Sequence, residues 1–303
     1  MPIPVLYQSL PSPDPIIGDY APLLTLHRDT LTEALTETRG WIVLAGVEGL
    51  DDPPRSLIDV EPSTWDGSMP TGARYQPRDV FIPLFYSAKS TRELRDTVRR
   101  MASLLDVKRG PVTLRLSHAD GTIREINGRL AAPLSPAAFS QSEGSLWRKL
   151  GVTLRCSDPF WHGEQRSQTF SLGDPLPFLS DTFLPVTISE SQVTGGTLIT
   201  NAGDADAYPV WTLVGPCDSA TITMHDTLFT VNDLTEGQTL VVDTRRGYQS
   251  VMLDDALAWG RLAQGAKLGA LPPGDSFMSL TISGAGEGTE LSMQWQERWL
   301  TAW

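Results

Sequence analysis

The sequence predicts a mainly β protein of two domains: an N-terminal α+β domain with one helix, followed by an antiparallel β-sandwich. Three observations support this. A chain of 303 residues suits two domains of roughly 100–200 residues each. A helix signature occurs in the first half, and the second half consists of short strand-like runs separated by turn residues. We place the boundary after Trp161, which gives domains 1–161 and 162–303.

Composition and charge exclude several classes of protein. The formal net charge of −12 argues against binding nucleic acid through its phosphates, and hence against sequence-specific nucleic-acid recognition. No apolar run approaches the roughly 20 residues needed to span a membrane, and the N-terminus lacks the positive charge of a secretory signal. We therefore expect no membrane insertion. We also expect that Cys156 and Cys217 are buried thiols and not a disulfide.

The first 77 residues contain two unusual stretches. Residues 1–20 carry five prolines and predict an extended arm lying on another surface. After a short strand candidate at 41–44, residues 46–77 form a long, irregular stretch rich in Asp, Pro and Gly. Loops of that length are either functional or ordered by a neighbour. Contact with another subunit and a simple surface excursion both remain open.

The next strand and the helix are defined by local patterns. Residues 80–86 (VFIPLFY) are apolar on both faces, as in a strand buried on both sides, although Pro83 favours an edge or a bulge. Ser90 and Glu93 then fit a capping box. The apolar face of the predicted helix follows at helical spacing in Leu94, Val98, Met101 and Leu105. The basic residues within 92–109 favour the solvated face of that helix over a binding patch.

A hairpin and a junction complete the first half. Residues 112–116 alternate, Asp120-Gly121 supplies a turn, and 123–130 returns. Residues 150–156 (LGVTLRC) then form an alternating strand that a proline stops. The junction between the two domains follows directly, with four candidate anchor residues: Asp158, Pro159, Phe160 and Trp161.

The second half offers many short strands. Turn residues separate them, and this pattern is typical of an antiparallel sandwich or jelly roll. The candidates are residues 183–188, 196–200, 208–213, 220–224, 227–231, 239–242, 250–253, 278–283 and 290–296.

No catalytic, cofactor or metal-binding motif stands out. The four histidines form no HExxH motif and no metal-ligand spacing with the cysteines, and GxSxG is absent. We therefore expect a non-enzymatic protein with no catalytic residue, no cofactor and no metal. The nine tryptophans allow three interpretations: core packing, interface anchors, or a sugar-binding platform that uses residues such as Trp211 or Trp295.

Several short motifs, taken in order, resemble phage distal tail proteins of the siphovirus tail component type. They are YQPRDVFIPLFY (75–86), SDPFW (157–161), NAGDADAYPVWTLVGP (201–216) and LPPG (271–274). The residues that match the family pattern of the third motif are Asn201, Gly203, Ala205, Pro209, Val210, Leu213 and Gly215. In the last motif Asp275-Ser276 departs from the family pattern, which has asparagine there.

The resemblance implies a split-barrel N-terminal domain and a galectin-like C-terminal sandwich. It implies a virion protein assembled in the host cytoplasm, whose copies close into a homo-hexameric ring at the tail tip. That ring would contact the tail tube protein and the tail-tip hub protein, let DNA and the tape-measure protein pass, and offer a platform for receptor-binding proteins. The alternative is a carbohydrate-binding or receptor-binding tail protein that recognises host-surface glycan.

A ring requires a head-to-tail interface between subunits that closes by rotation. We take the strand at 80–86 as a candidate, with interface residues Val80, Ile82, Leu84 and Tyr86, together with the 46–77 stretch and the proline-rich arm. Deletion of residues 1–18 is expected to weaken assembly more than folding.

Overall fold

The computed structural model describes residues 22–134, 144–171 and 192–303. These divide into two compact units: unit 1, from residues 1–161 together with Leu300–Trp303, and unit 2, His162–Trp299. The proline-rich arm and the predicted strand at 183–188 lie outside the described residues. The predicted mainly β class with antiparallel sheets is confirmed, with one α-helix in the described part of the chain.

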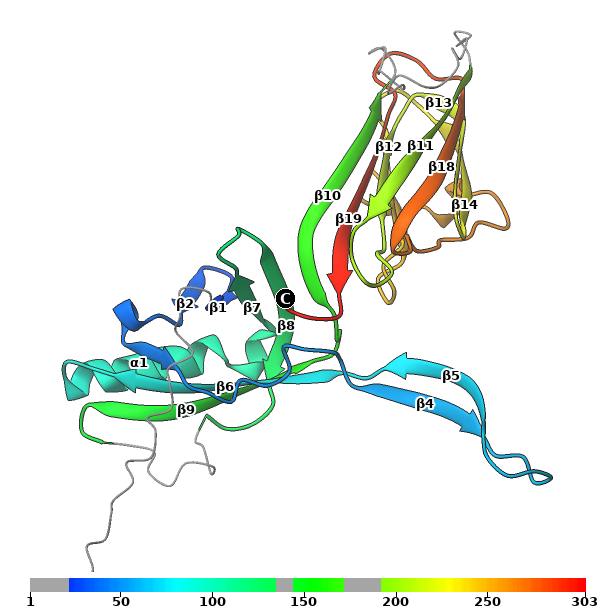
Figure 1. Cartoon of the computed structure of the whole chain (residues 1–303). Coiled ribbons are helices and arrows are strands. Elements are labelled where there is room, and N and C mark those ends of the chain that lie inside the picture. Colours follow the sequence, from blue (N-terminus) through cyan, green and yellow to red (C-terminus); the bar gives the residue numbers. More distant parts are fainter. Residues whose placement is uncertain (1–21, 135–143, 172–191) are drawn as a thin grey trace, which may run out of the picture. The chain divides into compact units, whose positions relative to one another are not determined.

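Unit 1 is built on a strand order of β2-β1-β7-β8-β9-β6-β3 (Figure 1). Strand β8 joins the two halves of this order, because it pairs through residues 123–128 with β7 and through Arg129 and Leu130 with β9. The strands are β1 (Leu23–Arg28), β2 (Leu31–Ala34), β3 (Trp41–Val43), β6 (Arg78–Ser87), β7 (Val112–Ser117), β8 (Ile123–Leu130) and β9 (Trp147–Cys156).

Helix α1 (Thr91–Leu104) begins where the capping box predicts. The Ser90 hydroxyl accepts from the Glu93 main-chain N–H at 3.1 Å, and the Glu93 carboxylate accepts from the Lys89 N–H at 2.9 Å. The helix buries Leu94, Thr97, Met101 and Leu104. Its Thr97 hydroxyl lies 3.0 Å from the Tyr86 hydroxyl, which joins the helix to β6. No helix in the described part of the chain is long and apolar enough to cross a membrane.

Strand β6 is not an edge strand, although it contains Pro83. It pairs with β9 over its full length and with β3 on the other side. The main-chain N–H and C=O of Phe81 both bond to Glu48. The main-chain groups of Pro83, two residues further along β6, point to the same side of the strand as those of Phe81. The missing N–H of Pro83 therefore points to the segment after β3, where no ladder partner is needed. Pro83 still accepts a hydrogen bond from the Leu44 N–H at 2.9 Å.

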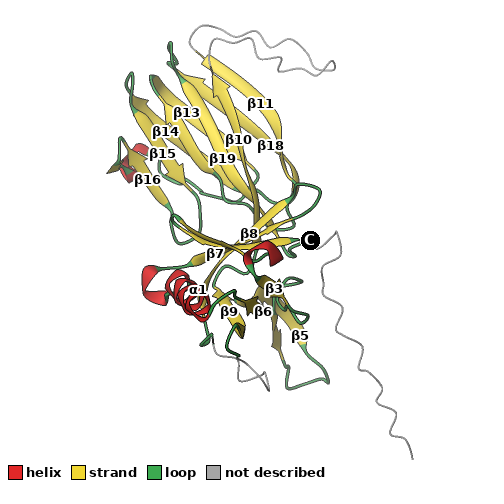
Figure 2. Cartoon of the chain, turned by 90° about the vertical axis from the view of Figure 1, so that its left-hand side faces the viewer, coloured by secondary structure: helices red, strands yellow, loops and turns green. Residues whose placement is uncertain are grey.

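Unit 2 is a sandwich of two sheets, which Figure 2 shows as layers of strands. One has the order β10-β19-β12-β15-β16-β17, and the other β11-β18-β13-β14. The first contains β10 (Trp161–Ser171), β12 (Val210–Val214), β15 (Thr239–Asp243), β16 (Ser250–Leu253), β17 (Ala256–Leu257) and β19 (Glu290–Trp299). The second contains β11 (Gln192–Asn201), β13 (Cys217–Met224), β14 (Thr227–Leu234) and β18 (Gly274–Ser283).

The core of unit 2 is formed by the inward residues of both sheets. They include Trp211, Leu213, Ile222, Phe229, Leu280 and Met293. The side chains of Trp211 and Phe229 meet edge to face, with ring centroids 5.9 Å apart. Alternation along each strand places these apolar side chains on one face, which is the pattern expected for a half-buried sheet.

Several elements were not predicted from the sequence. Strand β10 carries a polar run, HGEQRSQ, which lacks the apolar alternation of its neighbours. The 46–77 stretch contains a two-stranded hairpin, β4 (Arg55–Val60) and β5 (Met69–Tyr75), instead of an irregular loop. Three short 3₁₀ turns complete the described structure: η1 (Glu37–Arg39), η2 (Val107–Arg109) and η3 (Trp259–Arg261).

Candidate assembly surface

The four interface candidates of β6 lie in the core of unit 1. Val80, Ile82 and Leu84 are 0% exposed and Tyr86 is 2% exposed. Tyr86 packs against Trp41 with ring centroids 4.5 Å apart. This corrects the expectation that β6 presents these side chains to another subunit, because strands pair with both edges of β6 and these side chains already fill the unit's own core.

The alternate residues of β6 face the other side of the sheet. Phe81 and Phe85 are half-buried, and Phe85 stacks on Trp147 with ring centroids 5.7 Å apart. The Phe81 ring lies over Gly151, where a Cβ atom would come within 2.9 Å of its Cε2. Only glycine leaves room for the ring at that position. This face of β6 therefore contains aromatic side chains that are partly open to solvent.

The hairpin β4–β5 is the most exposed part of unit 1. It forms a separate two-stranded sheet, and most of its residues are exposed (Figure 1). Its exposed large apolar side chains are Leu57 (70%), Ile58, Val60, Trp65 (59%), Met69 and Tyr75. A two-stranded ribbon of this kind is at best marginally stable in water on its own. Exposed apolar side chains on such a ribbon make it a candidate interaction surface.

The contacts that hold the base of the hairpin to unit 1 include a main-chain hydrogen bond and an aromatic pair. The Gln76 N–H donates to the Pro54 carbonyl at 2.7 Å. The Tyr75 ring meets the Phe160 ring edge to face, with centroids 5.3 Å apart. The hairpin is therefore fixed at its root, while its tip at residues 61–68 is free of strand pairing.

Arg78 is a buried residue near the hairpin root that hydrogen-bonds three main-chain carbonyls. The residue is 1% exposed, and its Nη1 donates to the carbonyls of Gly49 and Asp51 at 3.0 and 2.7 Å. Its Nη2 donates to the Leu300 carbonyl at 2.6 Å, and the guanidinium lies 5.8 Å from the centre of the Trp161 ring. Burial lowers the pKa of Arg78. An arginine stays charged in proteins, so these carbonyls stabilise a buried cation.

The junction residues are accounted for within unit 1. The Asp158 carboxylate accepts from the Phe160 N–H at 3.3 Å, which closes the turn that Pro159 begins. Trp161 is 0% exposed beneath Arg78, and Phe160 contacts the hairpin root. Both aromatic residues therefore have packing partners, as an anchor requires. Their role in setting the angle between the domains stays a prediction.

The last residues of the chain return to unit 1, which no sequence pattern indicated. The Ala302 N–H donates to the Leu50 carbonyl at 2.8 Å, and the His118 ring nitrogen lies 2.7 Å from the Ala302 carbonyl. The Trp303 indole N–H donates to the Asp51 carboxylate at 3.1 Å. The terminus thus adds a backbone segment beside the 49–51 loop that Arg78 holds.

The tryptophans proposed as a sugar platform are core residues. Trp211 is 1% exposed and Trp295 is 7% exposed. Neither can stack on a sugar ring, since both faces of an indole in the sandwich core are covered by protein. The core-packing interpretation is therefore the correct one for these two residues.

The described residues hold no group of three or more metal-ligating side chains. Both cysteines are free and buried, and burial raises the pKa of Cys156 to about 12. A thiol so far from ionisation is a poor nucleophile. The prediction that both cysteines are buried thiols and not a disulfide is confirmed.

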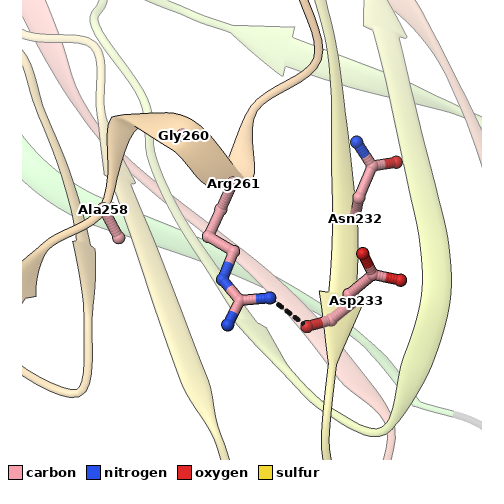
Figure 3. A pocket seen from close by; sticks show the side chains of 5 residues that line it. All are labelled: Asn232, Asp233, Ala258, Gly260 and Arg261. Atoms are coloured by element: carbon pink, nitrogen blue, oxygen red, sulfur yellow. Dashed lines mark hydrogen bonds between the residues drawn. The ribbon is translucent and has the colours of Figure 1, made fainter.

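A small surface pocket lies in unit 2 (Figure 3). It is lined by Asn232, Asp233, Ala258, Gly260 and Arg261. Arg261 donates from Nη1 to the Asp233 main-chain carbonyl at 2.7 Å, which ties η3 to β14. The basic side chain of this pocket therefore closes a loop.

Sequence reasoning singled out the 46–77 stretch but missed the residues within it that matter. Leu57, Trp65 and Met69 carry no motif, and only the weak alternation of RSLIDV hints at a strand. Arg78 lies within the YQPRDVFIPLFY motif (75–86), and no local pattern indicates a role for it. Its importance depends on partners at both ends of the chain.

The comparisons with known proteins concern the fold. No protein-family model matches the sequence, and no curated protein matches it significantly. The structure of the SPP1 Dit protein (gp 19.1), described as a paradigm of the hub adsorption apparatus in Gram-positive infecting phages, is similar with a TM-score of 0.60 and 13% identity. The similarity covers 91% of this chain and 98% of that one.

A second similar structure is a chain of the phage P2 baseplate in its activated conformation. It has a TM-score of 0.51 and 8% identity, and covers 91% of this chain and 98% of the other. The chain therefore has the fold of these tail and baseplate proteins along nearly its whole length. The resemblance to phage distal tail proteins stated from the sequence is thus matched by the three-dimensional structure.

Proposed function

We propose that this chain is a structural protein of the tail tip of a long-tailed phage, where copies of it close into a hexameric ring. The ring joins the tail tube protein to the tail-tip hub protein and lets DNA and the tape-measure protein pass. Unit 1 forms the ring, and unit 2 projects from it as a platform for receptor-binding proteins. The chain is assembled in the host cytoplasm and resides in the virion.

The observation that carries the proposal is the exposed hairpin β4–β5 on a fold shared with a phage hub protein. The two strands pair only with each other, so each leaves one edge of main-chain donors and acceptors unpaired. Apolar side chains such as Leu57 and Trp65 add surface whose burial is favourable. A neighbouring subunit can satisfy both requirements at once.

Ring closure also needs an interface in which different surfaces of identical subunits meet. The hairpin projects at one end of β6, and in this proposal it docks on a different surface of the neighbouring subunit. Such a contact is head-to-tail, and it gives a ring when the rotation between neighbours closes.

Native mass spectrometry of the purified chain, with electron microscopy of the same sample, tests the proposal. We expect a mass of six chains of 33.1 kDa each and ring-shaped particles with a central channel. A chain that stays monomeric at every concentration up to its solubility limit contradicts the proposal. Rings that bind tail tube or hub proteins in pull-down experiments support the proposed position.

A further inference from the structure

The exposed face of helix α1 is strongly basic in a chain whose net charge is −12. The exposed basic residues on α1 and the adjoining η2 turn are Arg92, Arg95, Arg99, Arg100, Lys108 and Arg109. Three of them have carboxylate partners in the same unit: Arg92 with Asp96, Arg100 with Glu33, and Arg109 with Asp106. These pairs account for half of the positive charge of this face.

Arg95 and Arg99 have no ion pair in the part of the chain that the structure describes. They stand four residues apart on the helix, where neighbouring like charges repel one another. A negative charge from another molecule, placed near both guanidinium groups, offsets the repulsion between them. Arg95 and Arg99 are therefore the residues of the basic face at which binding of an external negative charge is most favourable.

The tip of the hairpin has the opposite charge. Residues 59–69 contain Asp59, Glu61 and Asp66 and no basic residue. The Ser68 hydroxyl donates to Asp59 at 3.2 Å, and no ion pair involves Glu61 or Asp66 among the described residues. Trp65 is 59% exposed beside them. The tip is thus acidic and carries an aromatic ring that can lie over a guanidinium.

The two charged surfaces sit at opposite ends of β6. The hairpin ends at Tyr75, just before β6 starts at Arg78, whereas α1 starts at Thr91, just after β6 ends at Ser87 (Figure 1). Ten strand residues span about 33 Å. The tip and the helix start of one chain are therefore separated, so an ion pair between the two surfaces would join the tip of one copy to the helix of another.

We propose that the acidic hairpin tip of one copy docks on Arg95 and Arg99 of the next copy. Glu61 and Asp66 supply the negative charges, and Trp65 covers a guanidinium. This pairing rests on the proposed ring and names the two surfaces that form its interface. It also explains why an acidic protein keeps two exposed arginines on this face without an ion pair in the described part of the chain.

A charge swap tests the pairing. One variant carries Arg95→Glu and Arg99→Glu, a second carries Glu61→Arg and Asp66→Arg, and a third combines all four changes. We expect each of the first two to weaken self-association by about tenfold or more, and the combined variant to recover most of the loss. Sedimentation velocity over a concentration series at low and high salt measures the effect.

A matched control changes the same charge elsewhere. Glu236→Arg with Glu287→Arg alters two exposed carboxylates of unit 2 and is expected to leave self-association unchanged. Rings that form normally in both swap variants overturn the pairing while leaving the proposed function standing. A wild-type chain that never self-associates overturns both. If Arg95→Glu with Arg99→Glu abolishes binding of a DNA oligonucleotide but not assembly, the face serves nucleic acid and the pairing is wrong.

Discussion

Arg78 donates a 2.6 Å hydrogen bond to the carbonyl of Leu300, which lies 222 residues later in the chain. The same guanidinium binds the carbonyls of Gly49 and Asp51. Charge-assisted hydrogen bonds of this kind are stronger than neutral ones, and a buried acceptor that loses its donor is costly. A single side chain therefore joins the hairpin root, the 49–51 loop and the C-terminus.

Replacement of Arg78 is expected to destabilise unit 1. Arg78→Ala removes three charge-assisted hydrogen bonds to partly buried carbonyls, so we expect a loss of about 3 kcal/mol in the free energy of unfolding. Urea denaturation measures it. The control Arg74→Ala changes an exposed arginine of β5 and should stay within about 0.5 kcal/mol of wild type. Equal stability of the two variants would contradict the role of Arg78.

Removal of Leu300–Trp303 is expected to affect unit 1, although the deleted residues directly follow a strand of unit 2. The deletion removes acceptors or donors from Arg78, Leu50 and His118. We expect a loss of about 1–3 kcal/mol and faster amide hydrogen exchange at residues 49–51. Trp303→Ala, which keeps the backbone contacts, should cost less. Faster exchange confined to residues 192–299 would refute this prediction.

Polar substitutions in the hairpin are expected to weaken assembly without unfolding the chain. Leu57→Ser and Trp65→Ser change exposed side chains, so the melting temperature of the monomer should hardly move. Self-association should fall, because apolar area that a neighbour covers is lost. Leu257→Ser in unit 2, at a residue 73% exposed, is the matched control and should assemble normally. Sedimentation velocity compares the three variants.

Cys156 makes the stability of the chain depend on pH in the alkaline range. Burial raises its pKa to about 12, whereas the unfolded chain loses this proton near pH 9. Between these values the unfolded state binds fewer protons than the folded state, so the free energy of unfolding falls as the pH rises. Denaturation at pH 8, 9 and 10 checks the slope. In Cys156→Ala this part of the slope should vanish.

The same burial predicts slow thiol chemistry. Burial raises the pKa of Cys217 as well as that of Cys156. We expect neither thiol to react with a thiol-specific reagent at pH 8 in the native protein, and both to react in denaturant. Rapid reaction of a thiol in the folded chain would show that its side chain is accessible.

Local patterns in the sequence were sufficient for the elements that depend on nearest neighbours. Ser90 and Glu93 mark the start of α1, Asp120-Gly121 marks the turn between β7 and β8, and alternation marks most strands of the sandwich. Each of these features depends on residues within one helical turn or one strand pair. The mainly β class with one helix followed from them directly.

The candidate site could be predicted only in part. Contact with another subunit was one of two open interpretations of the 46–77 stretch. Its hairpin was not predicted, because fully exposed strands lack the apolar alternation that burial imposes. The β6 residues were assigned to the wrong surface for the opposite reason. An apolar run such as VFIPLFY is equally consistent with a core and an interface, and only the neighbouring strands distinguish the two.

The sequence by itself determined helix α1, most strands of the sandwich and the resemblance to phage distal tail proteins, because local spacing and motif order encode all three. The tertiary structure decided which apolar side chains are buried and brought Arg78 to Leu300. It also set the acidic hairpin tip and the basic helix face at opposite ends of β6. These relationships join residues far apart in the chain, and no local pattern specifies which distant partners meet.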